Sequence, residues 1–409
     1  MSTQQAAAGQ ARSSLVLATL FSGVFVLGCA ELLVVGMLNL IAAGLHVSIP
    51  TAGTLVTANA LGIAIGGPVL TALTIKLNRR PVVLGSMLVF ALANLLPVLE
   101  PNYGLFIGAR VVAGAVQGLF LAAAFMTGMA IVPQARAGRA ISVIISGVAV
   151  SAAFGVPLGT LLGQELGWRD AFGAIVAIGV LALIAMVALV PSVPGAAAGD
   201  SQAKYAFAPR VLAVLGVCFL AFASLFATLT YIVPFLQHVT GITGAAVSAF
   251  VFAYGFATAV GSFGGGRFAD KNAPLTLIVT TSGAAAALLV LYFVGSVQVL
   301  VALVLLAWGV FAFGMTSSLQ LRVVSLAGPG GQLASSLPAS AINIGIALGS
   351  LAGGIAYSHS GVKAPMITGL IIAVIAIVAA GATRRLVPPV IAAAPGGQVP
   401  EPAAAPESI

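Results

Sequence analysis

The chain has 409 residues, of which 60% are hydrophobic and only 6% are charged, and its formal net charge is +8. Soluble globular proteins carry roughly 25% charged residues, so this composition excludes a water-soluble domain and predicts a protein that is solvated by lipid. Transmembrane strands would alternate polar and apolar residues in segments of about 10, whereas the runs in this chain are longer and apolar on all sides. The predicted fold class is therefore all-α and integral to the membrane.

Clusters of charged residues, Pro and Gly divide the chain into twelve apolar segments, each predicted to be a transmembrane helix. In chain order these are 15–44, 51–76, 82–99, 104–131, 138–163, 170–191, 209–237, 245–268, 275–295, 298–324, 331–357 and 364–383. The polar, Pro/Gly-rich residues 192–208 are predicted to link a six-helix bundle at 14–191 to a second one at 209–385. Residues 1–13 form a short N-terminal segment, and the Ala/Pro-rich residues 386–409 are predicted to be a disordered tail.

The basic residues predict how the chain is oriented in the membrane. If both termini and the loops after even-numbered helices lie in the cytoplasm, thirteen Lys and Arg residues lie there, and two, Arg169 and Lys363, lie on the other side. The positive-inside rule therefore predicts a multi-pass protein of the cell (plasma or inner) membrane, with its termini, linker and tail in the cytoplasm. This topology accounts for the basic charge, so we expect no nucleic-acid partner.

Metal and cofactor chemistry finds no support in the sequence. Cys29 and Cys218 both fall in predicted membrane helices, at a spacing that fits neither a metal site nor a disulfide framework. The three histidines, His46, His238 and His359, fall at or near helix ends. There is no H-E-x-x-H motif and no pair of intramembrane aspartates, so we expect no metal, no cofactor and no enzymatic activity.

Glu31, in the stretch GCAELLVVGM (28–37), is a carboxylate deep inside the first predicted helix. It lies about 13 residues from the outer end of that helix, or roughly 20 Å, which is too far for a short side chain to reach the headgroups. A central acidic residue costs ~2.5–3.5 kcal/mol on insertion, so it normally faces a cavity or a partner. Burial favours the protonated carboxyl and a nearby cation favours the ionised one, so such a group can change protonation when its cavity opens to a different side. The alternative is a permanently protonated Glu31 without a role.

Arg110, in LFIGARVVAGAVQGLF (105–120), is the one basic residue that falls inside a predicted helix away from the loops. It lies about 6 residues, or roughly 9 Å, from the start of the fourth helix. In one interpretation its side chain extends to the outer headgroups. In the other it faces the interior of the bundle and pairs with Glu31.

Small residues recur every fourth position in the fifth helix, GVAVSAAFGVPLGTLLG (147–163). They are Gly147, Ser151, Gly155, Gly159 and Gly163. This spacing lets helix backbones approach closely in lipid, and Pro157 favours a kink. The eleventh helix has a similar stripe at Ala341, Gly345, Gly349 and Gly353.

Two loops related by six helices carry basic residues. The loop TALTIKLNRRPVV (71–83) contains Lys76, Arg79 and Arg80, and the loop GRFADKNAPLTL (266–277) contains Gly266, Asp270 and Lys271. Topology alone would explain the basic residues, because both loops are predicted to be cytoplasmic.

These motifs, in this order, resemble those of the major facilitator superfamily. The two loops are similar to its signature G-x-x-x-D-(R/K)-x-G-(R/K)-(R/K), although Thr71 and Ile75 replace the Gly and Asp in the first. The fifth helix resembles the G-x-x-x-G-P-x-x-G signature of the drug:proton antiporters, with Pro157 one place later, as in the arabinose-efflux and chloramphenicol-exporter-like subset. Arg110 followed by Gln117 and Gly118 resembles the proton-coupling motif of the family, and the helix that carries Glu31 resembles the first helix of that subset.

The resemblance implies two pseudo-symmetric six-helix bundles around a central cavity that opens to alternate sides of the membrane. It implies drug efflux driven by the proton gradient, without any other cofactor, with Glu31 and Arg110 as the proton-coupling residues. We also expect helices 1–6 to superpose on helices 7–12, and the stripe from Gly147 to Gly163 to pack against a helix of the other bundle.

Few polar residues are available to line such a cavity. The candidate substrate-binding residues are Asn39, Asn59, Gln117, Tyr231, Tyr254, Trp308, Phe311 and Asn343. Because they are uncharged, they favour a mostly apolar, neutral ligand over a sugar or a polyanion.

The sequence therefore predicts a proton-coupled exporter of small hydrophobic compounds, such as phenicol-type antibiotics. It would act as a monomer in the bilayer, with the small-molecule substrate and protons as its partners. Two alternatives remain open: proton-linked uptake or efflux of a nutrient such as a sugar or nucleoside, and a membrane sensor without transport.

Overall fold

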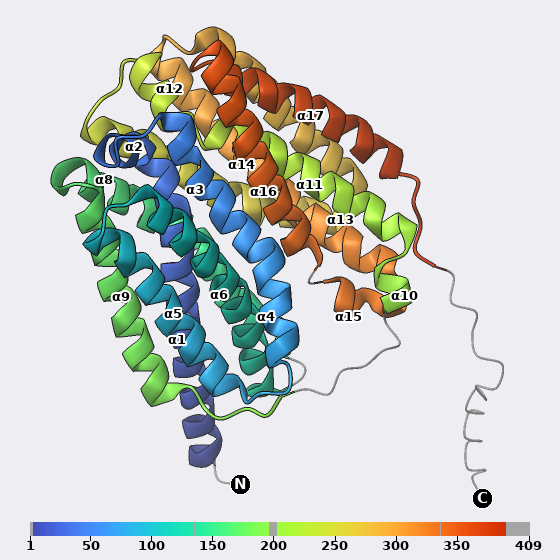
Figure 1. Cartoon of the computed structure of the whole chain (residues 1–409). Helices are drawn as coiled ribbons and strands as arrows, with labels where there is room; N and C mark the ends of the chain where they lie inside the picture. Colours follow the sequence, from blue (N-terminus) through green and yellow to red (C-terminus); the bar gives the residue numbers. More distant parts are fainter. Residues whose placement is uncertain (1–2, 134–135, 196–202, 336, 390–409) are drawn as a thin grey trace, which may run out of the picture.

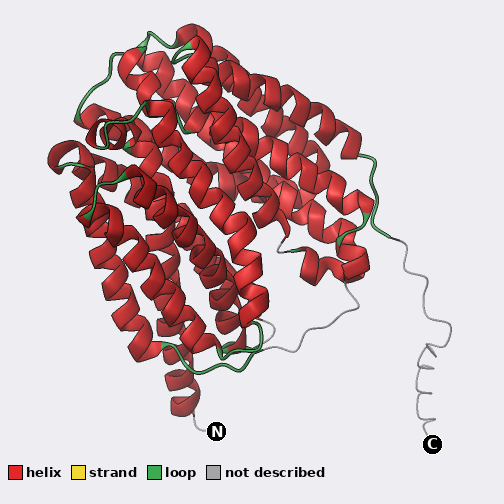
Figure 2. Ribbon diagram, in the orientation of Figure 1, coloured by secondary structure: helices red, strands yellow, loops and turns green. Residues whose placement is uncertain are grey.

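The computed structural model describes residues 3–133, 136–195, 203–335 and 337–389, and these residues form helices and loops without any strand (Figure 2). The helices form two bundles that stand side by side (Figure 1). The predicted tail beyond residue 389 and part of the predicted linker, 196–202, lie outside the described residues. The predicted domain limits therefore remain predictions.

The N-terminal bundle runs from α1 to α9. Its helices are α1 (Thr3–Gly36), α2 (Leu38–Gly44), α3 (Ile49–Leu61), α4 (Gly67–Thr74), α5 (Arg79–Leu99), α6 (Tyr103–Ala130), α7 (Ala137–Val150), α8 (Val156–Leu166) and α9 (Trp168–Leu189). Side-chain caps start several of them: Ser48 accepts a hydrogen bond from the N–H of Thr51 (3.2 Å), and Asn102 accepts one from that of Leu105 (3.1 Å).

The C-terminal bundle runs from α11 to α17, after the short α10 (Ala203–Ala206). Its helices are α11 (Pro209–Leu229), α12 (Ile232–His238), α13 (Ala245–Val294), α14 (Gln298–Ala327), α15 (Gly331–Ala334), α16 (Leu337–Ser360) and α17 (Ala364–Thr383), with a 3₁₀ turn η4 (Gly328–Gly330) before α15.

Eleven helical stretches among the described residues are long and apolar enough to cross a membrane, and one of them, α13, crosses twice. Its 50 residues would span about 75 Å if straight, more than twice the hydrocarbon core. The backbone of Asn272 is extended (φ −158°, ψ 83°), and its side chain caps a new helix by accepting the N–H of Leu275 (3.0 Å). Gly261 and Gly283, on either side of this kink, both lie against α14, so the chain doubles back. The twelve predicted transmembrane segments are thus confirmed.

Short π-helical segments interrupt two membrane helices, η1 (Gly62–Gly66) before α4 and η3 (Ser151–Gly155) before α8. Each precedes a proline, Pro68 or Pro157. A proline ring clashes with the carbonyl four residues earlier, and that carbonyl falls inside the π segment in both cases. The wider turn therefore accommodates the prolines without ending either transmembrane helix.

The predicted first and seventh helices are each broken, which the sequence-based assignment of single helices missed. Met37 separates α1 from α2 (φ −121°, ψ 20°), and Tyr231 separates α11 from α12 with nearly the same backbone angles (φ −109°, ψ 16°). At the second break Pro234 lacks the N–H that would bond to the carbonyl of Thr230. The equivalent positions of the breaks in the two bundles reflect their pseudo-symmetry.

Glycine-lined helix pairs repeat this symmetry. A Cβ placed on Gly345, Gly349 or Gly353 of α16 would lie 2.2–2.4 Å from the carbonyls of Phe219, Ala223 and Ala227 on α11, so the two helices run in step at four-residue intervals. The stripe of the fifth membrane helix follows α1 at the same spacing, from Gly147 beside the carbonyl of Phe21 to Gly163 beside the Met37 side chain, although its later glycines face side chains and not carbonyls.

The expectation that this stripe faces the other bundle is therefore wrong. A four-residue spacing defines one face of a helix, and the parallel α1 of the same bundle covers that face along its whole length. Contact with the other bundle is made by the neighbouring face: a Cβ on Gly255 of α13 would lie 2.2 Å from the carbonyl of Ala152. The close contact between the fifth membrane helix and α13 thus depends on Gly255 of α13.

The substitution Gly155→Leu should destabilise the protein by about 1–3 kcal/mol, because the first added carbon would lie 2.2 Å from the Cys29 sulfur and α1 would have to move away. Thermal unfolding of purified protein would measure this. Gly173→Leu on α9 is the matched control, because a Cβ there has no neighbour within 4 Å. Equal unfolding midpoints for the two variants would contradict the assigned helix contact.

Candidate functional site

Two side chains of α6, the fourth membrane helix, donate hydrogen bonds to Glu31 and to the residue before it. The amide nitrogen of Gln117 donates to its carboxylate (Nε2 to Oε2, 2.6 Å), and one guanidinium nitrogen of Arg110 donates to the carbonyl of the preceding residue, Ala30 (3.1 Å). Glu31 itself is half-buried, whereas Arg110 is only 1% exposed. The interpretation in which Arg110 extends to the headgroups is therefore wrong, and its charge faces the bundle interior.

The polar atoms of this group are incompletely satisfied. Nε and Nη2 of Arg110 and the amide oxygen of Gln117 are buried without a hydrogen-bond partner among the described residues. Each buried polar atom without a partner costs free energy, so these three atoms destabilise the present arrangement of Glu31, Arg110 and Gln117. The other acidic residues of the described chain, Glu100, Glu165, Asp170 and Asp270, lie at or near helix ends or beside the Asn272 kink.

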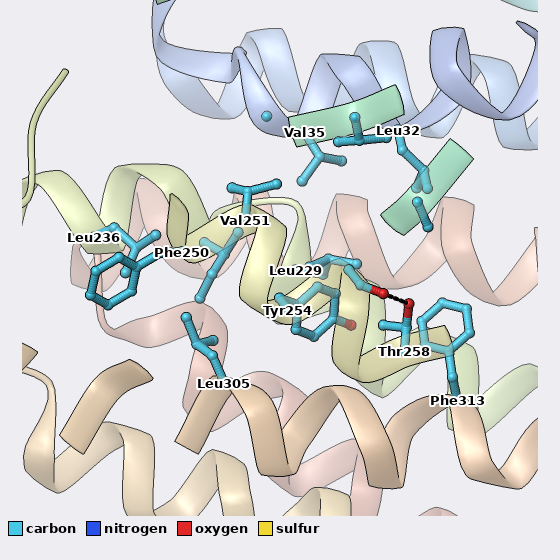
Figure 3. Close-up of a pocket in the computed structure, with 15 residues that line it drawn as sticks. Leu32, Val35, Leu229, Leu236, Phe250, Val251, Tyr254, Thr258, Leu305 and Phe313 are labelled. Atoms are coloured by element: carbon cyan, nitrogen blue, oxygen red, sulfur yellow. Dashed lines mark hydrogen bonds between the residues drawn. The ribbon is translucent and has the colours of Figure 1, made fainter. Parts of the chain in front are cut away.

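A cavity of about 580 Å³ lies between the two bundles (Figure 3). Its labelled lining side chains come from α1 above and from α11, α12, α13 and α14 below: Leu32, Val35, Leu229, Leu236, Phe250, Val251, Tyr254, Thr258, Leu305 and Phe313. Ala152 and Val156 of the fifth membrane helix complete the wall. A lining of apolar side chains with few polar groups is typical of small-molecule sites.

Among the described residues that line this cavity, the polar side-chain groups are two hydroxyls, those of Tyr254 and Thr258. Thr258 donates its hydroxyl to the carbonyl of Gly255 (2.7 Å), so it has no proton left to donate. The Tyr254 hydroxyl is buried without a partner among the described residues. The cavity therefore matches an uncharged, mostly apolar ligand.

The carboxylate and the cavity adjoin along one helix. Leu32, which lines the cavity, directly follows Glu31, and Val35 lines it one turn further on. A displacement of α1 at Glu31 therefore moves the cavity wall.

The structure distributes the other predicted substrate-binding residues widely. Tyr254 lines the cavity, and Trp308 lies behind it, with ring centroids 5.1 Å apart. Asn59 is 1% exposed with no partner for its amide, and Asn343 donates to the carbonyl of Ala339 (2.9 Å). The ring of Phe311 lies against Gly283 on the far side of α14, so Phe313 rather than Phe311 reaches the cavity. A role in binding stays a prediction for each of them.

The first loop motif binds the last turn of α9 and the chain that follows it. The main-chain N–H of Arg79 bonds to the carbonyl of Val193 (2.8 Å), and Arg80 donates to the carbonyl of Val187 (2.7 Å). The Arg79 guanidinium is buried and bonds to the carbonyl of Ile75 (2.7 Å), while Lys76 lies against Gly195. We call this end of the molecule, residues 75–80 and 190–195, the linker end.

The second loop motif lies at the Asn272 kink. Gly266 faces Ser317 of α14, and a Cβ there would make an ordinary contact at 3.4 Å. Asp270 and Lys271 are both exposed.

Neutral side chains join the two bundles at the opposite end, where α2 and α12 lie, here called the α12 end (Figure 1). Asn39 of α2 bonds to Gln237 of α12. Ser350 of α16 donates to the carbonyl of Gly53 (3.3 Å), and Thr57 of α3 donates to that of Ala347 (3.2 Å).

Tyr231 seals this junction. It is 1% exposed, and its hydroxyl bonds to the carbonyl of Ser350 (3.1 Å). A Cβ added at Gly53 would lie only 2.3 Å from the same hydroxyl, and one added at Gly354 only 2.5 Å from it. The α12 end is therefore closed by side-chain hydrogen bonds across the bundles and by the Tyr231 hydroxyl packed against Gly53.

Paired six-helix bundles around an apolar cavity, closed at one end, are the architecture of a membrane transporter. The family model of the Major Facilitator Superfamily matches residues 20–337, and the chain belongs to this family. The family resemblance of the sequence motifs is thereby confirmed.

Related proteins agree with this assignment. The uncharacterized MFS-type transporter YtbD of Bacillus subtilis is 33% identical over 88% of this chain and 93% of its own length. A chloramphenicol resistance protein of Streptomyces lividans is 30% identical over 86% of this chain and 92% of its own length. A crystal structure of a bacterial homolog of the human lysosomal transporter Spinster, inward-facing and unoccupied, has the same fold: its TM-score is 0.77 at 16% identity, covering 92% of this chain and 97% of that one.

Gly53→Leu should open the α12 end, because its first added carbon would lie 2.3 Å from the Tyr231 hydroxyl. A cysteine at the fully buried Ala347, in a protein with Cys29 and Cys218 replaced by alanine, reports the change through its rate of maleimide labelling in detergent. We expect slow labelling with Gly53 and at least tenfold faster labelling (about 1.4 kcal/mol in the opening equilibrium) with Leu.

Gly85→Leu is the control, because no atom lies within 4 Å of a Cβ there. Labelling that is as slow in Gly53→Leu as in Gly85→Leu would show that Tyr231 does not hold the junction.

Proposed function

We propose that the protein is a proton-coupled exporter of small, uncharged, mostly apolar compounds. One observation carries the proposal: Gln117 donates a hydrogen bond to Glu31, and the next residue of the same helix, Leu32, lines an apolar cavity. The proton site and the ligand site then share α1, which gives the two bound species a mechanical connection.

Protonation of Glu31 changes the bond to Gln117 from a charge-assisted hydrogen bond to a neutral one, which is roughly half as strong. The hydrogen bond that holds α6 to α1 at Glu31 weakens as a result, and the part of α1 that carries the cavity-lining residues Leu32 and Val35 can then move. Deprotonation of Glu31 restores the stronger hydrogen bond to Gln117. Arg110 keeps a fixed positive charge near the site and favours the ionised carboxylate after the proton leaves.

In the proposed orientation the linker end faces the cytoplasm. The loop with Lys76, Arg79 and Arg80 lies there, and the positive-inside rule places such loops on the cytoplasmic side. Because the α12 end is closed by Tyr231 and its neighbours, the structure then corresponds to an inward-facing state. A ligand reaches the cavity from the cytoplasm or the inner leaflet.

The lining favours apolar compounds over sugars and nucleosides. A sugar requires several hydrogen-bond partners, and each one missing from a buried site costs affinity. The cavity supplies the hydroxyls of Tyr254 and Thr258, and the latter already donates its proton to Gly255. A phenicol antibiotic is a suitable first probe because a relative is named for chloramphenicol resistance.

Glu31→Gln should abolish export driven by a pH gradient while preserving ligand binding, because the amide keeps the shape of the carboxyl but does not titrate. The measurement is chloramphenicol transport in proteoliposomes with an imposed pH gradient, together with equilibrium binding of the same compound. Glu165→Gln, an exposed carboxylate near the end of α8, is the matched control and should transport like the parent protein. Undiminished pumping by Glu31→Gln would place the proton pathway elsewhere.

Expression of the protein in an efflux-deficient bacterial host should raise the inhibitory concentration of uncharged apolar antibiotics and leave that of highly polar ones unchanged. Glu31→Gln, produced in equal amount, should remove the gain. Resistance to no compound, combined with growth on a new sugar or nucleoside, would support the nutrient transporter instead.

A further inference from the structure

A second, much smaller cavity lies inside the C-terminal bundle and shares three helices, α11, α13 and α14, with the central one. Its lining includes Ser224 of α11, Thr281 of α13, Trp308 of α14 and Ala373 of α17. Ser224 donates to the carbonyl of Gly369 (2.7 Å) and Thr281 to that of Leu277 (2.7 Å), so neither hydroxyl has a proton left to donate. The second cavity is therefore apolar in character, like the first.

Adjacent turns of the same helices line the two cavities. On α11, Leu225 borders the second cavity and Leu229 the central one; on α14, Trp308 borders the second and Leu305 the central one. The two spaces are thus neighbours along both helices.

One aromatic pair stands between them. Tyr254 lines the central cavity, Trp308 lines the second, and their rings meet at 5.1 Å with planes tilted by 44°. Trp308 is 1% exposed and is among the largest fully buried side chains of the described residues. The Tyr254 hydroxyl in this pair has no hydrogen-bond partner among them, so the wall contains an unsatisfied polar atom.

We propose that the Tyr254–Trp308 pair sets the size limit of the ligand, and that the flat, apolar end of a longer ligand extends toward the second cavity once the Trp308 indole is removed. The inference rests on the proposed binding of apolar compounds in the central cavity. The alanines and the two satisfied hydroxyls of the second cavity favour a fused aromatic ring system over a polar or charged group. Removal of the Trp308 indole would join the two spaces.

The test uses three uncharged probes with one common polar part, the N-(2-hydroxyethyl) amides of benzoic, 2-naphthoic and 2-anthroic acid. Their dissociation constants are measured with the purified full chain in lipid nanodiscs. Trp308→Ala should bind the anthroyl amide about tenfold more tightly relative to the benzoyl amide than the parent does, a gain typical of added apolar contact in a pocket. Trp308→Phe opens less space and should favour the naphthoyl amide.

The other tryptophan of the chain provides the matched control. Trp168 is also buried (5% exposed), but it stacks on Phe106 within the N-terminal bundle, with ring centroids 5.7 Å apart. Trp168→Ala removes the same indole and should leave the ratio of the three dissociation constants unchanged.

The outcomes separate this inference from the proposed function. If the parent binds the amides but the Trp308 variants keep its ratio, or change it no more than Trp168→Ala does, the partition is wrong and the apolar ligand class stands. If neither the parent nor any variant binds any of the three amides, both the ligand class and the partition fall.

Discussion

The close approach of helix backbones at glycines is the constraint on which the whole structure depends. Lipid tails are as apolar as leucine side chains, so helices in a bilayer gain little from burying apolar groups and associate through main-chain proximity and packing. In the pair α11 with α16, glycines of one helix meet carbonyls of the other at four-residue steps, and in the pair α1 with α7–α8 the glycines beyond Gly147 receive side chains of the facing helix at the same spacing. Gly255 makes the same kind of contact between the bundles. The position of the cavity follows from these contacts.

Because most of the buried residues are apolar, the interactions of the few buried polar and charged side chains are strong. Glu31, Gln117 and Arg110 lie where the local dielectric is low and where a change of one charge is felt strongly. Their hydrogen bonds fix α6 to two consecutive residues of α1, Ala30 and Glu31. The unsatisfied atoms of Arg110 and Gln117 leave this group without the full set of bonds that would lock it in one arrangement.

The sequence predicted those features that hydropathy and charge determine directly: twelve crossings, two halves and an acidic group in the first helix. It did not predict the break at Met37, since the residues around it contain no proline and only a single glycine. The partner of the Gly147–Gly163 stripe was wrong because spacing defines a face and not what covers it. The cavity lining was largely missed, because Leu32, Val251 and Leu305 carry the same apolar pattern as lipid-facing residues. The hydrogen bond from Gln117 to Glu31 could not be predicted, because the sequence does not give the angle between α1 and α6, and the substrate-binding role of Gln117 stays a prediction.

The closure at the α12 end has a consequence for the medium that it faces. Its bonds are made by the side chains of Asn39, Gln237, Thr57, Ser350 and Tyr231, and none of these amide and hydroxyl groups takes up a proton when the medium is acidified. Acidification of the surroundings therefore leaves these bonds intact. Opening of the α12 end is therefore not triggered by acid acting on the side chains that close it.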